Sequence, residues 1–188
     1  MILYLHGFNS SPASKKACQL REAMAARGLA DQFHAPALPH RPTQAMALVH
    51  AWLREHTPDT VTFIGSSLGG YYATHLAETY ETRAVLINPA VRPYDLFATL
   101  LGPQQNLYTG ERYELTPEHI AELRALEVAA IHPERYLLLV ECGDEVLDYR
   151  SAVERYRGAQ QIVLEGGDHS FSHFGDYIDT VLHFAGLA

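Results

Sequence analysis

Short apolar runs alternate along the chain with longer segments in which apolar residues recur every three or four positions. The runs are almost continuously apolar instead of alternating with polar residues, which is typical of strands that are covered on both faces. We therefore predict six strands in the interior of the protein. They span residues 2–5, 33–38, 61–64, 84–87, 136–140 and 161–164.

The segments between these runs have the periodicity of helices with one apolar face. Ser11 followed by Pro12 is typical of a helix start, and Gly28 suits the position just after a helix end. Another helix is expected to start at Thr116, which precedes Pro117. We predict helices over residues 13–27, 44–56, 68–78, 149–157 and 174–184, and one more from Pro117 onward.

Strands and helices follow each other in turn, which predicts an α/β fold with a mostly parallel sheet of about six strands and helices on both faces. In such sheets ligands bind at the carboxyl ends of the strands. Residues 89–130 depart from this rhythm, because they exceed what a simple crossover between two strands needs. We predict one domain over residues 1–188, with a small cap or lid inserted at 89–130.

The composition is that of a folded protein, since 47% of the 188 residues are hydrophobic and 19% are charged. A formal net charge of −8 argues against nonspecific binding to nucleic acid or to an anionic membrane. Cys18 and Cys142 are too few for a disulfide framework or a cysteine-rich zinc site. The first residues do not resemble a signal peptide, and the apolar runs are too short to span a bilayer. We therefore expect a cytoplasmic protein; its oligomeric state is left open.

The segment Gly65-Ser66-Ser67-Leu68-Gly69 matches the pattern G-x-S-x-G and lies between a predicted strand and a predicted helix. A serine at this sharp turn is presented at the edge of the sheet as a nucleophile, in a strained backbone conformation. Side chains at positions 65 and 69 would collide with neighbouring backbone. The alternative is a glycine-rich helix start in which Ser66 or Ser67 serves only as the N-cap.

A nucleophilic serine needs a general base, and the base needs an orienting acid. In this architecture the three follow along the chain as serine, acid and histidine. Asp144 follows the fifth predicted strand, and His169 follows the sixth in a glycine-rich loop. We therefore predict Ser67 as nucleophile, His169 as general base and then acid, and Asp144 as the orienting carboxylate.

Other candidates for these roles fit less well. Asp148 is suited to cap the following helix, Asp168 is adjacent to His169 in sequence, and Glu141 is expected within the strand. His173 lies four residues after His169 but lacks a carboxylate pattern such as H-E-x-x-H. We therefore interpret it as a histidine at a helix start and predict no metal site.

An oxyanion hole requires two hydrogen-bond donors near the nucleophile. We predict that these are the backbone N–H groups of Leu68, which follows the serine, and of Phe8, in the loop after the first strand. Gly7 would let that loop approach the site closely. His6 is expected to brace the loop by hydrogen bonding.

The predicted cap contains large apolar residues that would suit an acyl chain. We predict Tyr94, Phe97 and Leu101 as substrate contacts; the alternative is that they form the core of the cap itself. Arg92 and Arg112 would meet a phosphate or carboxylate of the substrate, or else are solvated.

These motifs together resemble a known superfamily. HGF after the first strand, GSSLGG at the turn, GD after the fifth strand and GGDH after the sixth are similar to the α/β-hydrolase fold, here in a minimal version. The segments YLHGFNSSPxSxKA, GSSLGGYYATHLAE, INPAVRPYDLF and NLYTGERYELT resemble the small bacterial esterases named YqiA-like. The resemblance implies that Ser67, Asp144 and His169 form the triad and that the enzyme acts on acyl esters or thioesters without a cofactor.

The residues therefore predict a serine hydrolase, a carboxylesterase or acyl thioesterase, that acts on small molecules through an acyl-serine intermediate. Two alternatives stay open: a noncatalytic binding protein with the same fold, and an amidase or peptidase with the same triad. Dinucleotide binding is excluded because the glycines lack the G-x-G-x-x-G spacing.

Overall fold

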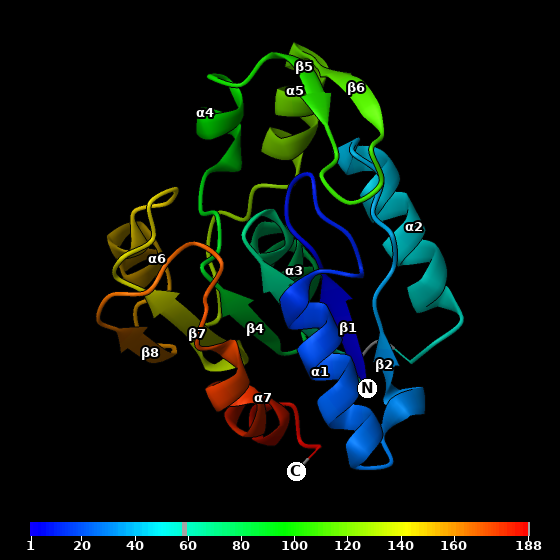
Figure 1. Ribbon diagram of the computed structural model, residues 1–188, viewed down its shortest axis with the longest axis vertical. Coiled ribbons are helices and arrows are strands. Elements are labelled where there is room, and N and C mark those ends of the chain that lie inside the picture. Colours follow the sequence, from blue (N-terminus) through cyan, green and yellow to red (C-terminus); the bar gives the residue numbers. More distant parts are fainter. Residues whose placement is uncertain (58–59, 188) are drawn as a thin grey trace.

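Six strands form a parallel sheet in the middle of the molecule, as seen in a computed structural model that describes residues 1–57 and 60–187 (Figure 1). The strand order is β2-β1-β3-β4-β7-β8, and every neighbouring pair is parallel. The strands are β1 (Ile2–Leu5), β2 (Phe33–His34), β3 (Thr62–Ser66), β4 (Ala84–Ile87), β7 (Tyr136–Glu141) and β8 (Gln160–Leu164). The predicted α/β fold with six strands is confirmed.

The second strand is shorter than predicted, since it ends at His34 instead of residue 38. Pro36 has no backbone N–H and cannot continue the hydrogen-bond ladder with β1. The amide of Leu38 donates instead to Nε2 of His6, at 3.0 Å.

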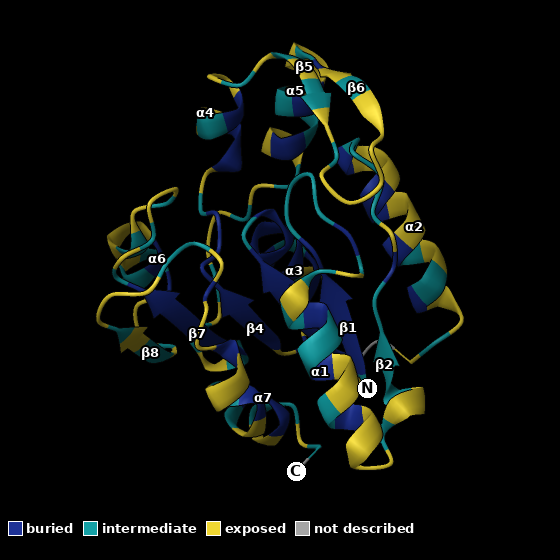
Figure 2. Ribbon diagram, in the orientation of Figure 1, coloured by how far each residue is buried: buried dark blue, intermediate teal, exposed yellow. Residues whose placement is uncertain are grey.

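Helices cover both faces of the sheet, and alternate residues of each strand point to opposite faces. On one face, Ile2 and Tyr4 of β1 pack with α1 and α7; on the other, Leu3 and Leu5 pack with α2 and α3. The four inner strands β1, β3, β4 and β7 are buried throughout, whereas the edge strands β2 and β8 are only partly buried, as Figure 2 shows. The elements are α1 (Lys15–Ala26), α2 (Pro42–Arg54), α3 (Leu68–Tyr80), α6 (Tyr149–Arg155), α7 (Ile178–Phe184), and the 3-10 turns η1 (Ala30–Gln32), η3 (Pro133–Arg135) and η4 (Phe174–Tyr177).

The start of α1 differs from the prediction. Ser14 is the N-cap and Lys15 the first helical residue, while Ser11 accepts a hydrogen bond from the amide of Ala13 in the turn before the helix. The predicted end is confirmed, because Gly28 follows the helix with φ +73°. The last predicted helix is divided into η4 and α7.

We call residues 89–130 the cap segment. Its helices and strands lie at the top of Figure 1, beyond the carboxyl ends of the parallel strands. They contain α4 (Pro93–Phe97), an antiparallel pair formed by β5 (Gly102–Gln105) and β6 (Arg112–Leu115), and α5 (Pro117–Ala125). The pair β5–β6 was not predicted. In the described part of the chain, no helix is long and apolar enough to cross a membrane.

Candidate active site

Ser67 lies in the sharp turn between β3 and α3, with φ 56° and ψ −120°, a conformation that residues other than glycine rarely adopt. The surrounding backbone holds this strain in place. The amide of Ser67 donates to the carbonyl of Ile87, and its carbonyl accepts from the amides of Gly70 and Ala90, all at 2.9–3.0 Å. The strained turn expected from the G-x-S-x-G pattern is therefore present.

The two glycines of the pattern leave no room for a side chain. A Cβ atom on Gly65 would lie 2.1 Å from the carbonyl oxygen of Gly69, and one on Gly69 would lie 2.0 Å from that of Leu5. Both distances are far below van der Waals contact, which confirms the predicted collision. The glycines therefore allow α3 to begin directly against β1 and β3.

The three residues predicted as a triad come together in one chain of hydrogen bonds. Oγ of Ser67 lies 3.1 Å from Nε2 of His169, and Nδ1 of His169 lies 2.8 Å from Oδ2 of Asp144. The side chain of Asp144 is 2% exposed and that of His169 is 22% exposed. The carboxylate is thus shielded, while the imidazole reaches the surface of a cavity.

Asp144 is held as a carboxylate. Its burial favours the neutral acid, but hydrogen bonds from His169 and from the amides of Leu147 and Val146 outweigh this effect and lower the pKa of Asp144 below its ordinary value. The neighbouring candidate, Asp148, caps α6 by accepting from the amide of Arg150, as predicted.

The loop that carries His169 is fixed by a side chain that sequence reasoning missed. Nδ2 of Asn88 donates to the carbonyls of Asp168 and His169, at 3.0 and 3.2 Å, and its Oδ1 accepts from the amide of Glu141. Asn88 is 2% exposed and has φ +40°. The amide of His169 donates to Glu145. The only signal in the sequence was an asparagine directly after the fourth strand, at the edge where ligands bind.

Glu141 supports the same loop from below. As predicted, it belongs to a strand; it is completely buried, accepts from the amide of Asp168 at 2.8 Å and pairs with Nδ1 of His173 at 2.6 Å. This pairing raises the pKa of His173. Gly167 passes so close that a Cβ there would lie 2.1 Å from the carboxylate of Glu141.

The loop after β1 approaches Ser67 closely. A Cβ on Gly7 would lie 3.2 Å from Cβ of Ser67. His6 braces this loop as predicted: its Nε2 accepts from Leu38, so its Nδ1 carries the proton and donates to the carbonyl of Gly7 at 3.0 Å. Among the described residues, neither the amide of Phe8 nor that of Leu68 donates a hydrogen bond.

A cavity of about 480 Å³ opens at Ser67 and His169. Most of the residues that line it have polar side chains, while Tyr4, Phe8, Leu107 and Tyr108 add apolar surface. The lining includes Phe8, Asn9, Ser10, Ser14, Lys15, Lys16, Leu107, Tyr108, Asp168, Ser170 and Ser172.

The residues predicted to contact an acyl chain do not border this cavity. Tyr94 and Phe97 are buried in the core, where Phe97 packs on Phe8 with ring centroids 4.6 Å apart, and Leu101 is 47% exposed elsewhere. That prediction is corrected: α4 turns Tyr94 and Phe97 toward the core, and Leu101, which follows α4, lies away from the cavity. The cap segment reaches the cavity instead through Leu107 and Tyr108.

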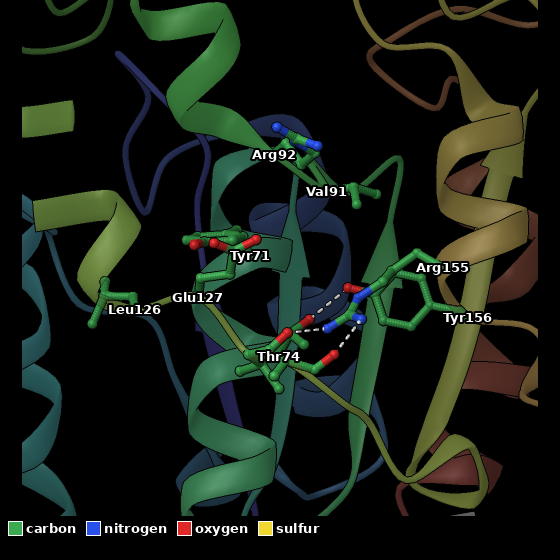
Figure 3. A pocket seen from close by; sticks show the side chains of 10 residues that line it. Tyr71, Thr74, Val91, Arg92, Leu126, Glu127, Arg155 and Tyr156 are labelled. Atoms are coloured by element: carbon green, nitrogen blue, oxygen red, sulfur yellow. Dashed lines mark hydrogen bonds between the residues drawn. The ribbon is translucent and has the colours of Figure 1, made fainter. Parts of the chain in front are cut away.

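A second cavity, of about 200 Å³, lies between α3 and the chain that leads from α5 to β7 (Figure 3). The polar groups in its wall form hydrogen bonds with one another. The hydroxyls of Thr74 and Tyr156 are 2.7 Å apart, and the guanidinium group of Arg155 donates to the backbone carbonyls of Val128 and Ala129. Arg92 borders it but pairs with Asp95. Ser67, Asp144 and His169 do not line this cavity.

The family model described as "Uncharacterised protein family (UPF0227)" matches residues 1–186. The chain belongs to this family. A UPF0227 protein of Citrobacter koseri is 26% identical, with 100% of this chain and 99% of that protein covered. The match confirms the family resemblance that the motifs predicted.

Solved structures place this UPF0227 chain in the α/β-hydrolase fold. Est1E from Butyrivibrio proteoclasticus superposes with a TM-score of 0.74 at 14% identity, covering 97% of this chain and 85% of that one. The mouse alpha/beta hydrolase domain-containing protein 10 gives 0.72 at 18% identity, covering 97% and 89%. Solved structures of this fold include esterases and lipases.

Proposed function

We propose that this protein is a serine hydrolase that cleaves carboxylic esters or thioesters through an acyl-Ser67 intermediate. The observation that carries the proposal is the hydrogen-bond chain from Ser67 through His169 to Asp144. It lies at the carboxyl edge of an α/β-hydrolase sheet, where a nucleophile is presented. Two further observations support the proposal. The backbone amides of Phe8 and Leu68 donate no hydrogen bond among the described residues, and solved structures of the same fold include esterases and a lipase.

In the first half of the reaction, Nε2 of His169 takes the proton of the Ser67 hydroxyl while Oγ attacks the carbonyl carbon. Asp144 orients the imidazole and stabilises its positive charge. The amides of Phe8 and Leu68 donate to the oxyanion that forms. The leaving alcohol or thiol departs with the proton from His169, and the acyl group stays on Ser67.

In the second half, His169 removes a proton from water while the water oxygen attacks the acyl carbon. The bond from the acyl carbon to Oγ of Ser67 then breaks, His169 returns the proton to Oγ, and the carboxylic acid leaves. All proton transfers use side chains of this chain, so the mechanism needs no cofactor.

The free thiols of Cys18 and Cys142 are in keeping with the cytoplasm as the place of action.

The proposal is tested with a fluorophosphonate probe, which reacts with activated serines, followed by peptide mass analysis. We expect one adduct, on Ser67, that is lost in Ser67→Ala and in His169→Ala. Ser66→Ala is the matched control, because Ser66 is the adjacent buried serine and should leave labelling intact. A folded protein that gives no adduct would indicate the noncatalytic alternative.

The leaving group is tested with an ester, a thioester and an amide of the same acyl group. The ester and thioester should be cleaved with much larger kcat/KM than the amide. A comparable rate on the amide would favour a peptidase or amidase.

A further inference from the structure

The chain contains two lysines, Lys15 and Lys16, and both border the cavity that opens at Ser67. They are the first two residues of α1. The protein as a whole has a formal net charge of −8, so this pair is a local concentration of positive charge beside the candidate nucleophile.

Neither ammonium group forms an ion pair with a carboxylate in residues 1–57 and 60–187. Nζ of Lys16 donates one hydrogen bond, to the carbonyl of Ser170 at 2.6 Å, in the loop that carries His169. An ammonium group has three donors, so two of them are available to a ligand. Lys15 is exposed at the rim.

The partial burial of Lys16 disfavours its charged form and lowers its pKa to about 8. This pKa is raised by the charges of Asp168, Glu141 and Asp144 and lowered further by that of Lys15, but the effect of burial is the largest. An incompletely solvated ammonium group gains more from a bound anion than a fully hydrated one.

The hydroxyl groups of the cavity point to the same kind of ligand. Oγ of Ser14 is buried and has no hydrogen-bond partner among the described residues, and it does not cap α1. Ser10, Ser170 and Ser172 add further hydroxyls to the cavity, and each hydroxyl can donate a hydrogen bond to an anion. Among the lining residues, Asp168 carries the one carboxylate, against two ammonium groups. The carboxylates of Glu141 and Asp144, which also act on Lys16, do not border the cavity and are hydrogen-bonded to His173 and His169.

We propose that this cavity binds the anionic end of the substrate, a carboxylate or a phosphate, between Lys15 and Lys16, with the hydroxyl of Ser14 as a further donor. The inference deepens the proposed function and rests on it: the preferred esters or thioesters carry a negative charge on the acyl part or on the leaving group.

The test compares anionic substrates with neutral counterparts of similar size. For the acyl part, the para-nitrophenyl monoester of glutaric acid is matched with that of glutaramic acid. For the leaving group, the butanoate esters of para-hydroxybenzoate and para-hydroxyphenyl phosphate are each matched with that of para-hydroxybenzamide. The wild type should prefer the anion in at least one pair by about tenfold or more in kcat/KM, the size expected from charge-assisted hydrogen bonds.

In the double variant Lys15→Met, Lys16→Met, the ratio of kcat/KM for the anionic substrate to kcat/KM for its neutral counterpart should fall close to one. A general loss of activity affects both substrates and therefore cancels in this ratio. Arg54→Met is the matched control, because Arg54 is an exposed cation at the end of α2 and does not border the cavity. A preference that survives in the lysine variant, or a wild type that prefers none of the anions, overturns the inference.

If the protein cleaves none of the esters and is not labelled on Ser67, the proposed function is refuted, but the inference about the cavity is not. The cavity is then tested by calorimetry with glutarate and the Ser67→Ala variant. Binding near pH 8 should take up protons, since a bound anion raises the pKa of Lys16, and the lysine variant should lose binding. Absence of binding overturns the inference.

Discussion

The side-chain amide of Asn88 donates a hydrogen bond to the backbone carbonyl of His169, at 3.2 Å, and a second one to that of the preceding residue, at 3.0 Å. Asn88 follows β4, and His169 lies in the loop after β8, so this contact joins two edges of the site that are 81 residues apart in the chain. The side chain of Asn88 therefore holds the backbone of His169, the proposed general base, without contacting its imidazole ring.

We expect Asn88→Asp to lower kcat by roughly tenfold to 10²-fold with little change in KM, because small misplacements of a catalytic group have effects of this size. The new carboxylate keeps the acceptor for the Glu141 amide but faces two carbonyl oxygens, which it repels. Steady-state kinetics and the rate of fluorophosphonate labelling measure the effect. Thr82→Val is the control, since Thr82 is a buried hydroxyl bonded to Val61, before β3. An unchanged kcat would refute the positioning role of Asn88.

Asp144→Asn should reduce kcat by about 10³–10⁴-fold, because an amide does not hold the imidazole in the required tautomer or stabilise its charge. Asp148→Asn should have little effect, since asparagine is also a good N-cap for α6. The two variants are compared by kcat and by thermal unfolding. A larger loss of rate in Asp148→Asn would show that the acid has been misassigned.

Gly7→Ala should lower kcat by about tenfold to 10²-fold, short of the complete loss of an oxyanion donor. The added Cβ would lie 3.2 Å from the carbonyl oxygen of Ser66 and from Cβ of Ser67, so the loop with Phe8 must shift outward. Gly175→Ala is the matched control, because its Cβ would meet only the end of Gln19 at 3.4 Å. If both variants keep full activity, the amide of Phe8 does not serve the oxyanion.

The four inner strands were predictable because burial on both faces leaves a continuous apolar run in the sequence. The edge strands β2 and β8 are only partly buried, and β2 is shorter than predicted. The pair β5–β6 was not predictable, since Gly102-Pro103-Gln104-Gln105 has no apolar pattern. Its partners come from far along the chain: Asn9 donates to Gln104 at 3.3 Å and accepts from Tyr113 at 2.8 Å. Tertiary contacts of this kind leave no local signal.

The residues of the predicted triad could be named because a motif and the chain order mark strand ends. The residues that hold these three in place, Asn88 and Glu141, could not be predicted in that role. Glu141 was expected only as part of a strand, and its contacts with the His169 loop require the neighbouring strand β8 in its register. The cap segment misled the prediction, because the apolar content of α4 does not tell whether its side chains face a cavity or the core.

The pair formed by His173 and the buried carboxylate of Glu141 should make stability depend on pH. The hydrogen bond and charge of Glu141 raise the pKa of His173 above its ordinary value of 6.5. The folded state therefore holds the proton more tightly than the unfolded state, so the stabilisation is complete below pH 6.5 and is lost as the pH rises through the raised pKa. We expect His173→Gln to lower the melting temperature most at pH 5–6 and progressively less at higher pH. Thermal unfolding across this range measures it. In a Glu141→Gln background the pH-dependent difference should disappear, and a difference that persists there would assign it to another group.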